Sequence, residues 1–391
     1  MTLDDREAYL VGGVRTPVGR YGGALSKVRA DDLAAIVVAE AVRRAKVDPA
    51  AVDEVVLGAA NQAGEDNRNV ARMAVLLAGL PLETSAYTVN RLCASGLTAV
   101  ANAAQAVRCG DADVVVAGGV ESMTRAPWVM AKPGTPWAKP GEVHDTALGW
   151  RFVNPRHDAE HTITLGETAE RVAALDGVSR ASSDAWGLRS QELAAKAIAD
   201  GRFDAEITPV GDVTADETPR ATSLERLAAL TPSFTRDGVV TAGTSSPLSD
   251  GASAVVVASG AAVRRLGLHA RARVVRAAAA GVEPHLMGLG PVPATTKALA
   301  GAGWDVGTLD AVELNEAFAV QVIASVRRLG LDEGVVNADG GAIALGHPLG
   351  SSGCRLVVTL LGRLEREGGR RGLATMCVGV GQGAALLVER V

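Results

Sequence analysis

The chain is poor in aromatic residues and in cysteine: 3% of its 391 residues are Phe, Trp or Tyr, and four are cysteines. The cysteines form no CxxC pair and have no histidine at a metal-ligand spacing, so we expect no metal site. Disulfides are also disfavoured, because the protein is expected in the cytoplasm, where thiols stay reduced. Each thiol is therefore a core residue or a nucleophile. Cys109 and Cys354 lie within helical stretches and are expected in the core.

A net positive charge and long apolar segments are also missing. The formal net charge of −5 argues against a nucleic-acid-binding surface. No apolar run is long enough to cross a bilayer. The first residues, MTLDDREAYL, do not resemble a signal peptide, and the last, LLVERV, carry no lipidation or sorting tag. We therefore expect a cytoplasmic protein that binds neither nucleic acid nor membrane.

Glycine is abundant, with 45 residues, and so are short apolar runs rich in Val and Ile. These runs alternate with longer Ala/Leu-rich stretches of helical character, and they lie at residues 55–57, 114–116, 255–257, 312–314 and 386–388. Continuous apolar strands suit a sheet covered by helices on both faces. The pattern predicts an α/β fold.

Two distant segments resemble each other. The chain reads TVNRLCASGLTAVANAAQAVRCGDADVVVAGG from residue 88 and VVNADGGAIALGHPLGSSGCRLVV from residue 335. Each copy has a strand ending in Val-Asn, a glycine-containing turn, an Ala/Leu helix and a second strand. Such self-similarity predicts a duplicated α/β unit.

Residues 124–241, between the two copies, differ in character and hold four of the five tryptophans. Loops on a rigid scaffold commonly carry binding residues, although a purely structural excursion also explains this segment. Within it we expect helices at residues 165–175 and 183–200. The predicted domains are residues 1–123 together with 242–271, an inserted loop domain at 124–241, and residues 272–391.

Cys93 lies in NRLCASG, before a helix expected to begin near Leu97. The positive end of a helix dipole lowers the pKa of a thiol and favours the thiolate, and free N–H groups there can bind an oxyanion. The pattern indicates a nucleophile. A small buried apolar side chain explains Cys93 alone equally well.

His347 lies in GGAIALGHPLGSSG, the most informative stretch of the chain. Pro348 disfavours the α conformation at His347 and suits the first turn of a helix. The glycines allow tight turns and let a ligand come close. The segment predicts a rigid turn that presents one imidazole; the alternative is an incidental histidine in a strand-to-helix turn.

Cys377 lies in ATMCVGVGQG at the end of an expected strand. No helix follows these glycines, which disfavours dinucleotide binding, whereas the N–H of Gly379 could donate to a reacting oxygen. Asn315, in NEAFA, ends another strand. Its amide either orients a water or substrate carbonyl, or caps a helix.

Taken together, the motifs around Cys93, Asn315, His347 and Cys377 resemble those of the thiolase family, and VRTPVGRYGG and TAGTSSPLSDGA extend the resemblance along the whole chain. The resemblance implies a duplicated five-layered α-β-α-β-α fold with an inserted loop domain. It implies an acyltransferase that makes or cleaves 3-oxoacyl-CoA by reversible Claisen chemistry. Coenzyme A and acetyl-CoA would be substrates, with no prosthetic group. A homodimer or a homotetramer built as a dimer of dimers is also implied.

The resemblance assigns roles by matching motif. Cys93 would carry the acyl group as a thioester, His347 would activate Cys93, and Cys377 would move the proton at the acyl Cα. One oxyanion hole would consist of His347 and a water held by Asn315. The other would consist of the N–H groups of Cys93 and Gly379, and such donors are typically worth about 2.7–4 kcal/mol each.

The family pattern further implies that coenzyme A lies against the inserted segment. The expected contacts are Gln191, Arg220, Phe234, Ala242, Ser246, Leu248, Met287, Ala317 and Phe318. Leu165 stands where many family members have a methionine near the substrate.

Several stretches, such as DTALGWRFVNPR, are most similar to the 3-oxoadipyl-CoA thiolases of aromatic catabolism, and a general acetoacetyl-CoA or 3-ketoacyl-CoA thiolase is the alternative. A distal carboxylate on the substrate would call for a basic residue, for which Arg68, Arg151 and Arg156 are candidates. A decarboxylating ketosynthase would have a histidine in place of Asn315 and would lack Cys377. A catalytically silent CoA- or lipid-binding relative would tend to lose one of the reactive side chains.

Overall fold

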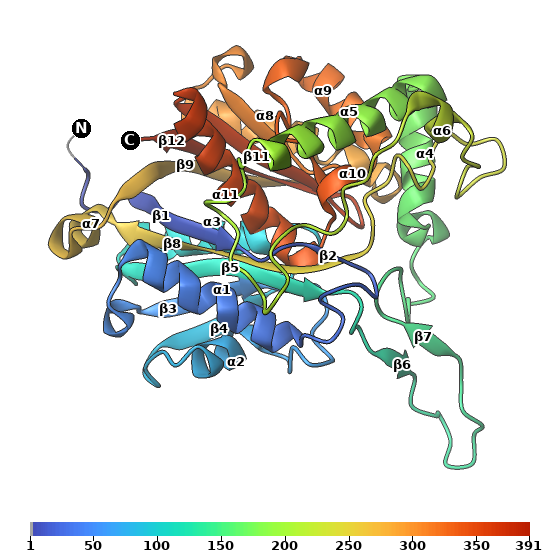
Figure 1. Ribbon diagram of the computed structural model, residues 1–391. Coiled ribbons are helices and arrows are strands. Elements are labelled where there is room, and N and C mark those ends of the chain that lie inside the picture. The colour runs from blue at the N-terminus through green and yellow to red at the C-terminus, as the bar shows by residue number, and fades with distance from the viewer. Residues whose placement is uncertain (1–2) are drawn as a thin grey trace.

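Ten strands form one hydrogen-bonded sheet in the computed structural model, which describes residues 3–391 (Figure 1). Their order is β10-β11-β12-β9-β1-β8-β5-β3-β4, and β2 pairs with β8. The strands are β1 (Ala8–Arg15), β2 (Gly19–Arg20), β3 (Glu54–Gly58), β4 (Ser85–Val89), β5 (Val114–Ser122), β8 (Ser249–Ser259), β9 (Ala270–Gly281), β10 (Ala311–Leu314), β11 (Arg371–Val378) and β12 (Gln382–Arg390). The five apolar runs noted in the sequence all lie in these strands.

The sheet consists of two copies of one pairing pattern, joined where β1 pairs with β9. In the first copy β4, β3 and β5 are parallel, followed by antiparallel β8 and β1. In the second, β10 and β11 are parallel, followed by antiparallel β12 and β9. Val336 forms a parallel bridge with Val312 of β10, so a single bridge takes the place of the strand expected there. The predicted duplication is confirmed.

Helices divide the structure into five layers, because alternate residues of each strand face different cores. Val11, on one face of β1, packs in a cluster with α1 (Ala30–Ala45) and α2 (Val70–Leu77). Leu10 packs in the central cluster with α3 (Ser95–Cys109) and α11 (Leu349–Glu367). A third cluster unites β10 and β11 with α8 and α9. The helices are α1 (Ala30–Ala45), α2 (Val70–Leu77), α3 (Ser95–Cys109), α4 (Leu165–Asp176), α5 (Arg180–Ala199), α6 (Leu224–Ala228), α7 (Gly260–Leu266), α8 (Pro291–Ala302), α9 (Ala319–Leu329), α10 (Ala342–Leu345) and α11 (Leu349–Glu367), with short 3-10 helices at Pro49–Ala51, Ala159–Thr162, Pro284–Leu289, Val306–Thr308 and Glu333–Val335.

The two helices of the central layer, α3 and α11, touch backbone to backbone. A Cβ added at Gly353 would lie 2.2 Å from the backbone nitrogen of Leu97, and one at Gly96 would lie 2.6 Å from the carbonyl oxygen of Gly350. Only glycine allows this approach. It brings the N-termini of the two helices together, and these are the ends at which Cys93 and His347 lie.

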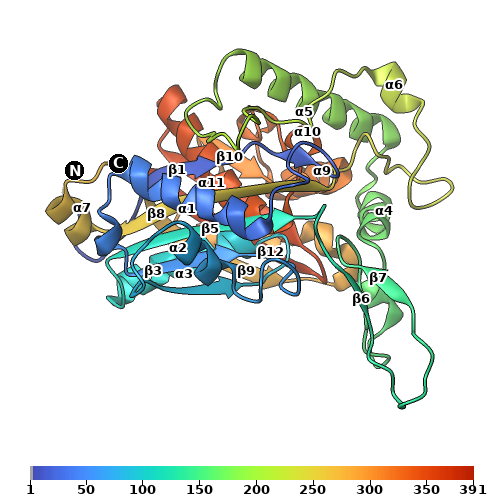
Figure 2. The same cartoon turned by 60° about the horizontal axis from the view of Figure 1, so that its bottom comes forward.

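Residues 124–241 contain the hairpin of β6 (Trp128–Met130) and β7 (Val143–Asp145) and the helices α4, α5 and α6. Figure 2 shows the hairpin projecting away from the layers. The helices expected at 165–175 and 183–200 are confirmed as α4 and α5. The division into three domains stays a prediction.

Within residues 3–391, none of the helices combines the length and the apolar character needed to cross a bilayer. Cys354 is buried as expected, but Cys109 is exposed. The prediction for Cys109 was wrong because this residue ends α3 and points away from the central layer.

Candidate active site

Cys93 lies on a strained turn between β4 and α3. Leu92, directly before it, has a φ of +46°, which a leucine adopts at a cost of about 1–3 kcal/mol. The turn is held by Asn90, whose Oδ1 accepts a 2.8 Å hydrogen bond from the N–H of Leu92. Ser95 adds a 2.6 Å bond from its hydroxyl to the Leu92 carbonyl. Because α3 begins at Ser95, the thiol lies at the helix N-terminus, as the sequence indicated.

Burial dominates the chemistry of the Cys93 thiol. It raises the pKa of Cys93 to about 11, although the N–H groups of Gly379 and of Cys93 itself act in the opposite direction. The lowered pKa expected from the helix dipole is therefore wrong for the resting protein. The free energy lost when a thiolate is removed from water exceeds the stabilisation that the helix N-terminus gives to its charge. The resting side chain is a neutral thiol that needs a base.

His347 occupies a tight turn between α10 and α11. Gly346 has a φ of +87°, which reverses the chain, and Pro348 is the N-cap residue of α11. Nδ1 of His347 lies 2.6 Å from Oγ of Ser352, and this hydroxyl donates its only proton to the Pro348 carbonyl at 3.0 Å. Ser352 must therefore accept from the Nδ1–H of His347. This leaves Nε2 as the unprotonated nitrogen.

The imidazole is also kept neutral. Burial lowers the pKa of His347 to about 3, and the positive charge of Arg355 adds to the shift. Nδ2 of Asn315 lies 3.4 Å from Nε2 of His347, where it can donate. Oδ1 of the same Asn315 is buried and accepts no hydrogen bond from residues 3–391. A neutral imidazole with a free Nε2 can take a proton from a neighbouring thiol.

Cys377 and Gly379 complete the cluster. Cys377 is at the end of β11 and is 1% exposed; burial, and then the neighbouring Cys93, raise its pKa. Cys93, His347, Cys377 and Gly379 all line one cavity of about 550 Å³. Asn315 lies behind His347 rather than on the cavity wall. The structure therefore brings together all five residues expected at the reaction centre.

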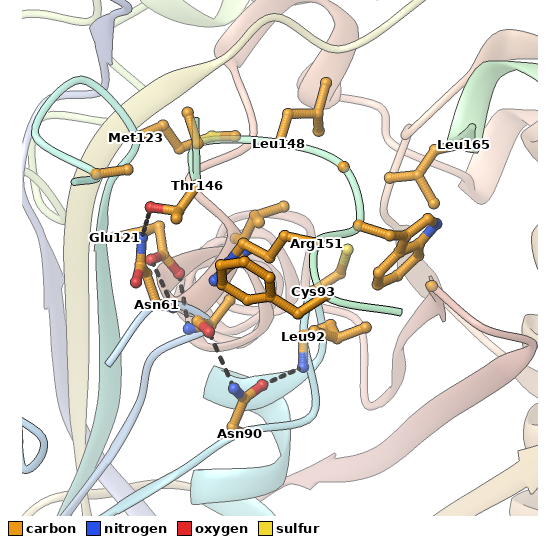
Figure 3. Close-up of a pocket in the computed structure, with 18 residues that line it drawn as sticks. Asn61, Asn90, Leu92, Cys93, Glu121, Met123, Thr146, Leu148, Arg151 and Leu165 are labelled. Atoms are coloured by element: carbon orange, nitrogen blue, oxygen red, sulfur yellow. Dashed lines mark hydrogen bonds between the residues drawn. The ribbon is translucent and has the colours of Figure 1, made fainter. Parts of the chain in front are cut away.

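Two cavities meet at Cys93. Beyond the thiol, a second cavity of about 420 Å³ extends past the polar side chains of Asn61, Glu121 and Arg151 (Figure 3). The residues that line both cavities are Cys93, Met123, Leu148, Gly149, Leu165, Leu349 and Gly379. This arrangement suits an elongated substrate whose reacting carbonyl lies at Cys93, with one part in each cavity.

The larger cavity holds eight of the nine residues expected to contact coenzyme A: Arg220, Phe234, Ala242, Ser246, Leu248, Met287, Ala317 and Phe318, all except Gln191. Six of these are apolar side chains, which suit a pantetheine arm. Gln191 is buried behind the wall, where its Oε1 accepts from the N–H of Arg220 at 2.9 Å. The geometry favours Gln191 as a support for Arg220 rather than as a direct contact.

Family comparison agrees with this geometry over the whole chain. Residues 8–261 match the family model of the thiolase N-terminal domain, and residues 268–390 match that of the thiolase C-terminal domain. The chain belongs to the thiolase family. This confirms the family inferred from the motifs and makes the protein an acyltransferase. The catalytically silent alternative loses its support.

Curated thiolases resemble the chain over their full length. A 3-oxoadipyl-CoA/3-oxo-5,6-dehydrosuberyl-CoA thiolase of Escherichia coli is 53% identical over 400 residues, covering 99% of this chain and 100% of that protein. A beta-ketoadipyl-CoA thiolase of Pseudomonas aeruginosa is 54% identical over 399 residues, with the same coverage. An acetyl-CoA acetyltransferase of Syntrophomonas wolfei is 45% identical over 397 residues, which cover 98% of this chain and 99% of that protein.

Solved thiolase structures share the fold. The acetyl-CoA acetyltransferase of Bacillus anthracis superposes with a TM-score of 0.93 at 40% identity, covering 98% of this chain and 99% of that one. Human mitochondrial 3-ketoacyl-CoA thiolase in complex with CoA gives a TM-score of 0.93 at 37% identity, and the match covers 100% of this chain and 99% of that one. The five-layered thiolase fold predicted from the sequence is thereby confirmed.

Sequence reasoning missed several residues of this thiolase site. Ser352, which orients His347, is separated from it by five residues along the chain, a spacing that brings a side chain at the first turn of α11 back to the imidazole. Trp150 packs against Gly379, where an added Cβ would lie 2.9 Å from its ring. The tryptophan-rich composition of the inserted segment was the available signal for Trp150. Arg151, one of three arginines considered, is the only one of them on a cavity wall among residues 3–391.

Proposed function

We propose that the protein catalyses the reversible cleavage of 3-oxoadipyl-CoA by coenzyme A, which yields acetyl-CoA and succinyl-CoA. The proposal is carried by the cavity that continues past Cys93 and has a polar wall with one arginine. An acetyl group alone would leave that space unused. The names of the relatives that are 53% and 54% identical support the same substrate. A general acetoacetyl-CoA thiolase is the competing function, favoured by the Syntrophomonas relative.

Cleavage begins with proton transfer from the Cys93 thiol to Nε2 of His347. Sγ of Cys93 attacks the C3 carbonyl of the substrate, whose oxygen becomes negative. The bond between C2 and C3 then breaks, and its electron pair remains on C2 as the enolate of acetyl-CoA. The thiol of Cys377 protonates C2, so acetyl-CoA leaves and a succinyl thioester stays on Cys93. His347 as the base and Cys377 as the acid line one cavity with Cys93, and these steps require both groups there.

The second half returns the enzyme to its resting state. The Cys377 thiolate removes the proton of a new coenzyme A thiol, and the resulting sulfur attacks the succinyl carbonyl. The carbonyl–Sγ bond breaks, and Cys93 regains its proton from the imidazolium of His347. Every proton and electron pair is thereby accounted for without a further reactant. In the reverse direction the same groups condense acetyl-CoA with succinyl-CoA.

Two oxyanion holes would stabilise the negative oxygens. Nε2–H of His347 donates once it has taken the proton, and a water held by the unpaired Oδ1 of Asn315 supplies a second donor. The N–H groups of Cys93 and Gly379 both lie close to Sγ, since both affect the pKa of Cys93. They can therefore bind the oxygen of the thioester formed there.

A mass-spectrometric experiment combined with kinetics tests the function. The protein is mixed with acetyl-CoA, quenched and digested, and we expect the Cys93 peptide to carry an acetyl group that added coenzyme A removes. The kcat/KM for 3-oxoadipyl-CoA is then compared with that for acetoacetyl-CoA. An unmodified Cys93 peptide would contradict the covalent mechanism. A higher kcat/KM for acetoacetyl-CoA would replace the proposed substrate by the general one.

We propose a homodimer or a dimer of dimers, as the family resemblance implied. The exposed side chains of Trp128, Met130 and Trp137 on the β6–β7 hairpin support a further contact between subunits, because such apolar groups are costly to leave in water. Sedimentation velocity of the purified protein should show a dimer or tetramer, and a monomer would contradict the proposal. The cytoplasmic location expected from the sequence stays a prediction that cell fractionation can check.

A further inference from the structure

Within residues 3–391, one basic side chain lies on the wall of the cavity beyond Cys93, that of Arg151. Figure 3 shows Arg151 among the side chains that line this cavity together with Cys93. Arg151 is partly buried, and among residues 3–391 it takes part in no hydrogen bond or ion pair that would hold its guanidinium. Most partly buried arginines of this protein are engaged, as Arg125 is with Glu65. A guanidinium on a cavity wall that no protein group holds is available to an anionic ligand.

We propose that Arg151 binds the distal carboxylate of the acyl group held on Cys93 and thereby sets the preference for an acyl chain that ends in a negative charge. The inference rests on the proposed function, because it names the residue that reads the substrate of that same site. Guanidinium and carboxylate form paired, charge-assisted hydrogen bonds with a fixed planar geometry, which lysine cannot reproduce.

The size of the cavity agrees with this assignment. A succinyl group on Cys93 has three carbon–carbon bonds of about 1.5 Å, so its carboxylate carbon lies within about 4 Å of the thioester carbon. The same cavity wall carries both Cys93 and Arg151, and a volume of about 420 Å³ leaves ample room for four carbons.

The segment that leads to Arg151 is anchored at two points. Thr146 accepts a 2.8 Å hydrogen bond from Nδ2 of Asn61 and donates to the carbonyl of Pro127 at 2.6 Å. Trp150, the residue directly before Arg151, donates from Nε1 to the carbonyl of Ile163 at 3.2 Å. A side chain on such a segment is positioned before the substrate arrives, which reduces the entropy lost on binding.

The carboxylate of Glu121 lies on the same wall, yet it does not oppose this role. Its two oxygens accept the N–H groups of Ala60, Asn61 and Gly350 at 2.8, 3.1 and 2.9 Å. Burial raises the pKa of Glu121 to about 7, so its charge is only partly developed near neutral pH. A negatively charged acyl end therefore meets the guanidinium without a full opposing charge.

The two other candidate arginines do not reach the cavity. Arg68 and Arg156 are both exposed, and neither lies on the wall of either cavity. Nε of Arg156 instead faces Oδ1 of Asn154 at 3.4 Å. Arg156 lies on the same segment as Arg151, five residues further on, and serves as a matched control.

The test compares two substrates of equal chain length, 3-oxoadipyl-CoA and the uncharged 3-oxohexanoyl-CoA. In Arg151→Gln we expect the ratio of kcat/KM for the charged to the uncharged substrate to fall about 10- to 100-fold, as for the loss of a hydrogen-bonded charge pair. Most of the loss should appear in KM, because the carboxylate is bound in the ground state as in the transition state. Arg151→Lys should retain part of the preference, and Arg156→Gln should leave both substrates unaffected.

The outcomes separate this inference from the function. If the unaltered protein prefers 3-oxoadipyl-CoA and Arg151→Gln keeps that preference, the assignment to Arg151 is wrong while the function stands. An equal fall for both substrates would show a merely structural role and would also overturn it. If the unaltered protein prefers the uncharged substrates, the proposed function fails together with the inference.

Discussion

The hydroxyl of Ser352 accepts the Nδ1–H of His347 and so determines which imidazole nitrogen carries the proton. The two residues are joined through the first turn of α11, and Pro348 contributes the carbonyl that takes the hydroxyl proton. Nε2 is left free to act as a base. The role of His347 is therefore built into the start of one helix.

Removal of this hydroxyl in Ser352→Ala should lower the rate of Cys93 acetylation about 10- to 100-fold, since a base with the wrong tautomer loses part of its catalytic contribution. The neighbouring variant Ser351→Ala is the control, because its hydroxyl bonds to Ser253 instead. Rapid-quench mass spectrometry measures acetylation, and nitrogen NMR of labelled histidine reports the tautomer. Equal rates in both variants would refute the positioning role.

The resting thiol of Cys93 should react as a neutral group at neutral pH. Its pKa is raised to about 11, so the thiolate fraction grows only as the pH rises through that value, whereas an unfolded cysteine titrates near about 8.5. Alkylation of the Cys93 peptide by iodoacetamide should therefore keep increasing above pH 9. Urea-unfolded protein provides the reference curve. A plateau already reached at pH 7 would reveal a preformed thiolate–imidazolium pair and contradict the neutral site.

The contact between α3 and α11 should be intolerant of even one methyl group. Gly353→Ala places Cβ against the backbone of Leu97 and should destabilise the protein by about 1–3 kcal/mol or more, while it also separates Cys93 from His347. Gly362→Ala on the same helix meets only the flexible end of Arg366 and should be neutral or stabilising by up to about 1 kcal/mol. Thermal unfolding distinguishes the two. Equal stability would show that the helices can move apart freely.

Glu316, which follows Asn315 in NEAFA, ties the inserted segment to the turn that carries His347. Its carboxylate accepts from Trp186 and Ser190 of α5 at 3.0 and 2.6 Å, and from the N–H of Ile343 in α10 at 3.2 Å. In Glu316→Gln the new amide N–H groups face donors that the carboxylate now accepts. The variant should therefore lose about 1–3 kcal/mol in the free energy of unfolding.

An exposed glutamate provides the comparison for Glu316. Glu365 pairs with Arg271 at the surface, and Glu365→Gln should change stability by less than about 1 kcal/mol. Urea titration of both variants measures the difference. A similar small change in each would mean that the buried carboxylate does not hold α5 and α10 together.

The reactive residues were predictable because short-range features of the chain mark them. Gly346 and Pro348 constrain the backbone on either side of His347, and the start of a helix follows Cys93, so the local pattern already indicates what each turn presents. The environment of these groups was less predictable. Burial by side chains distant in sequence reverses the shift of the Cys93 pKa that the helix alone implied.

Side-chain direction was the other limit of the sequence. Cys109 and Cys354 both lie in helices of the central layer, yet Cys109 ends its helix and faces solvent. The choice among three arginines likewise required the course of the inserted segment, whose anchors are hydrogen bonds between residues far apart. Only the fold shows that Arg151 reaches the cavity.

The division of labour between the two thiols is the central claim, and Cys377→Ala tests it most directly. In this variant we expect acetyl-CoA still to acetylate Cys93, since His347 activates the nucleophile and the coenzyme A thiolate can leave without the Cys377 proton. Condensation and cleavage should fall at least about 100-fold, because the group that moves the Cα proton is gone. Acetyl-Cys93 that accumulates without product formation is the predicted result. Near-normal turnover in Cys377→Ala would contradict the account.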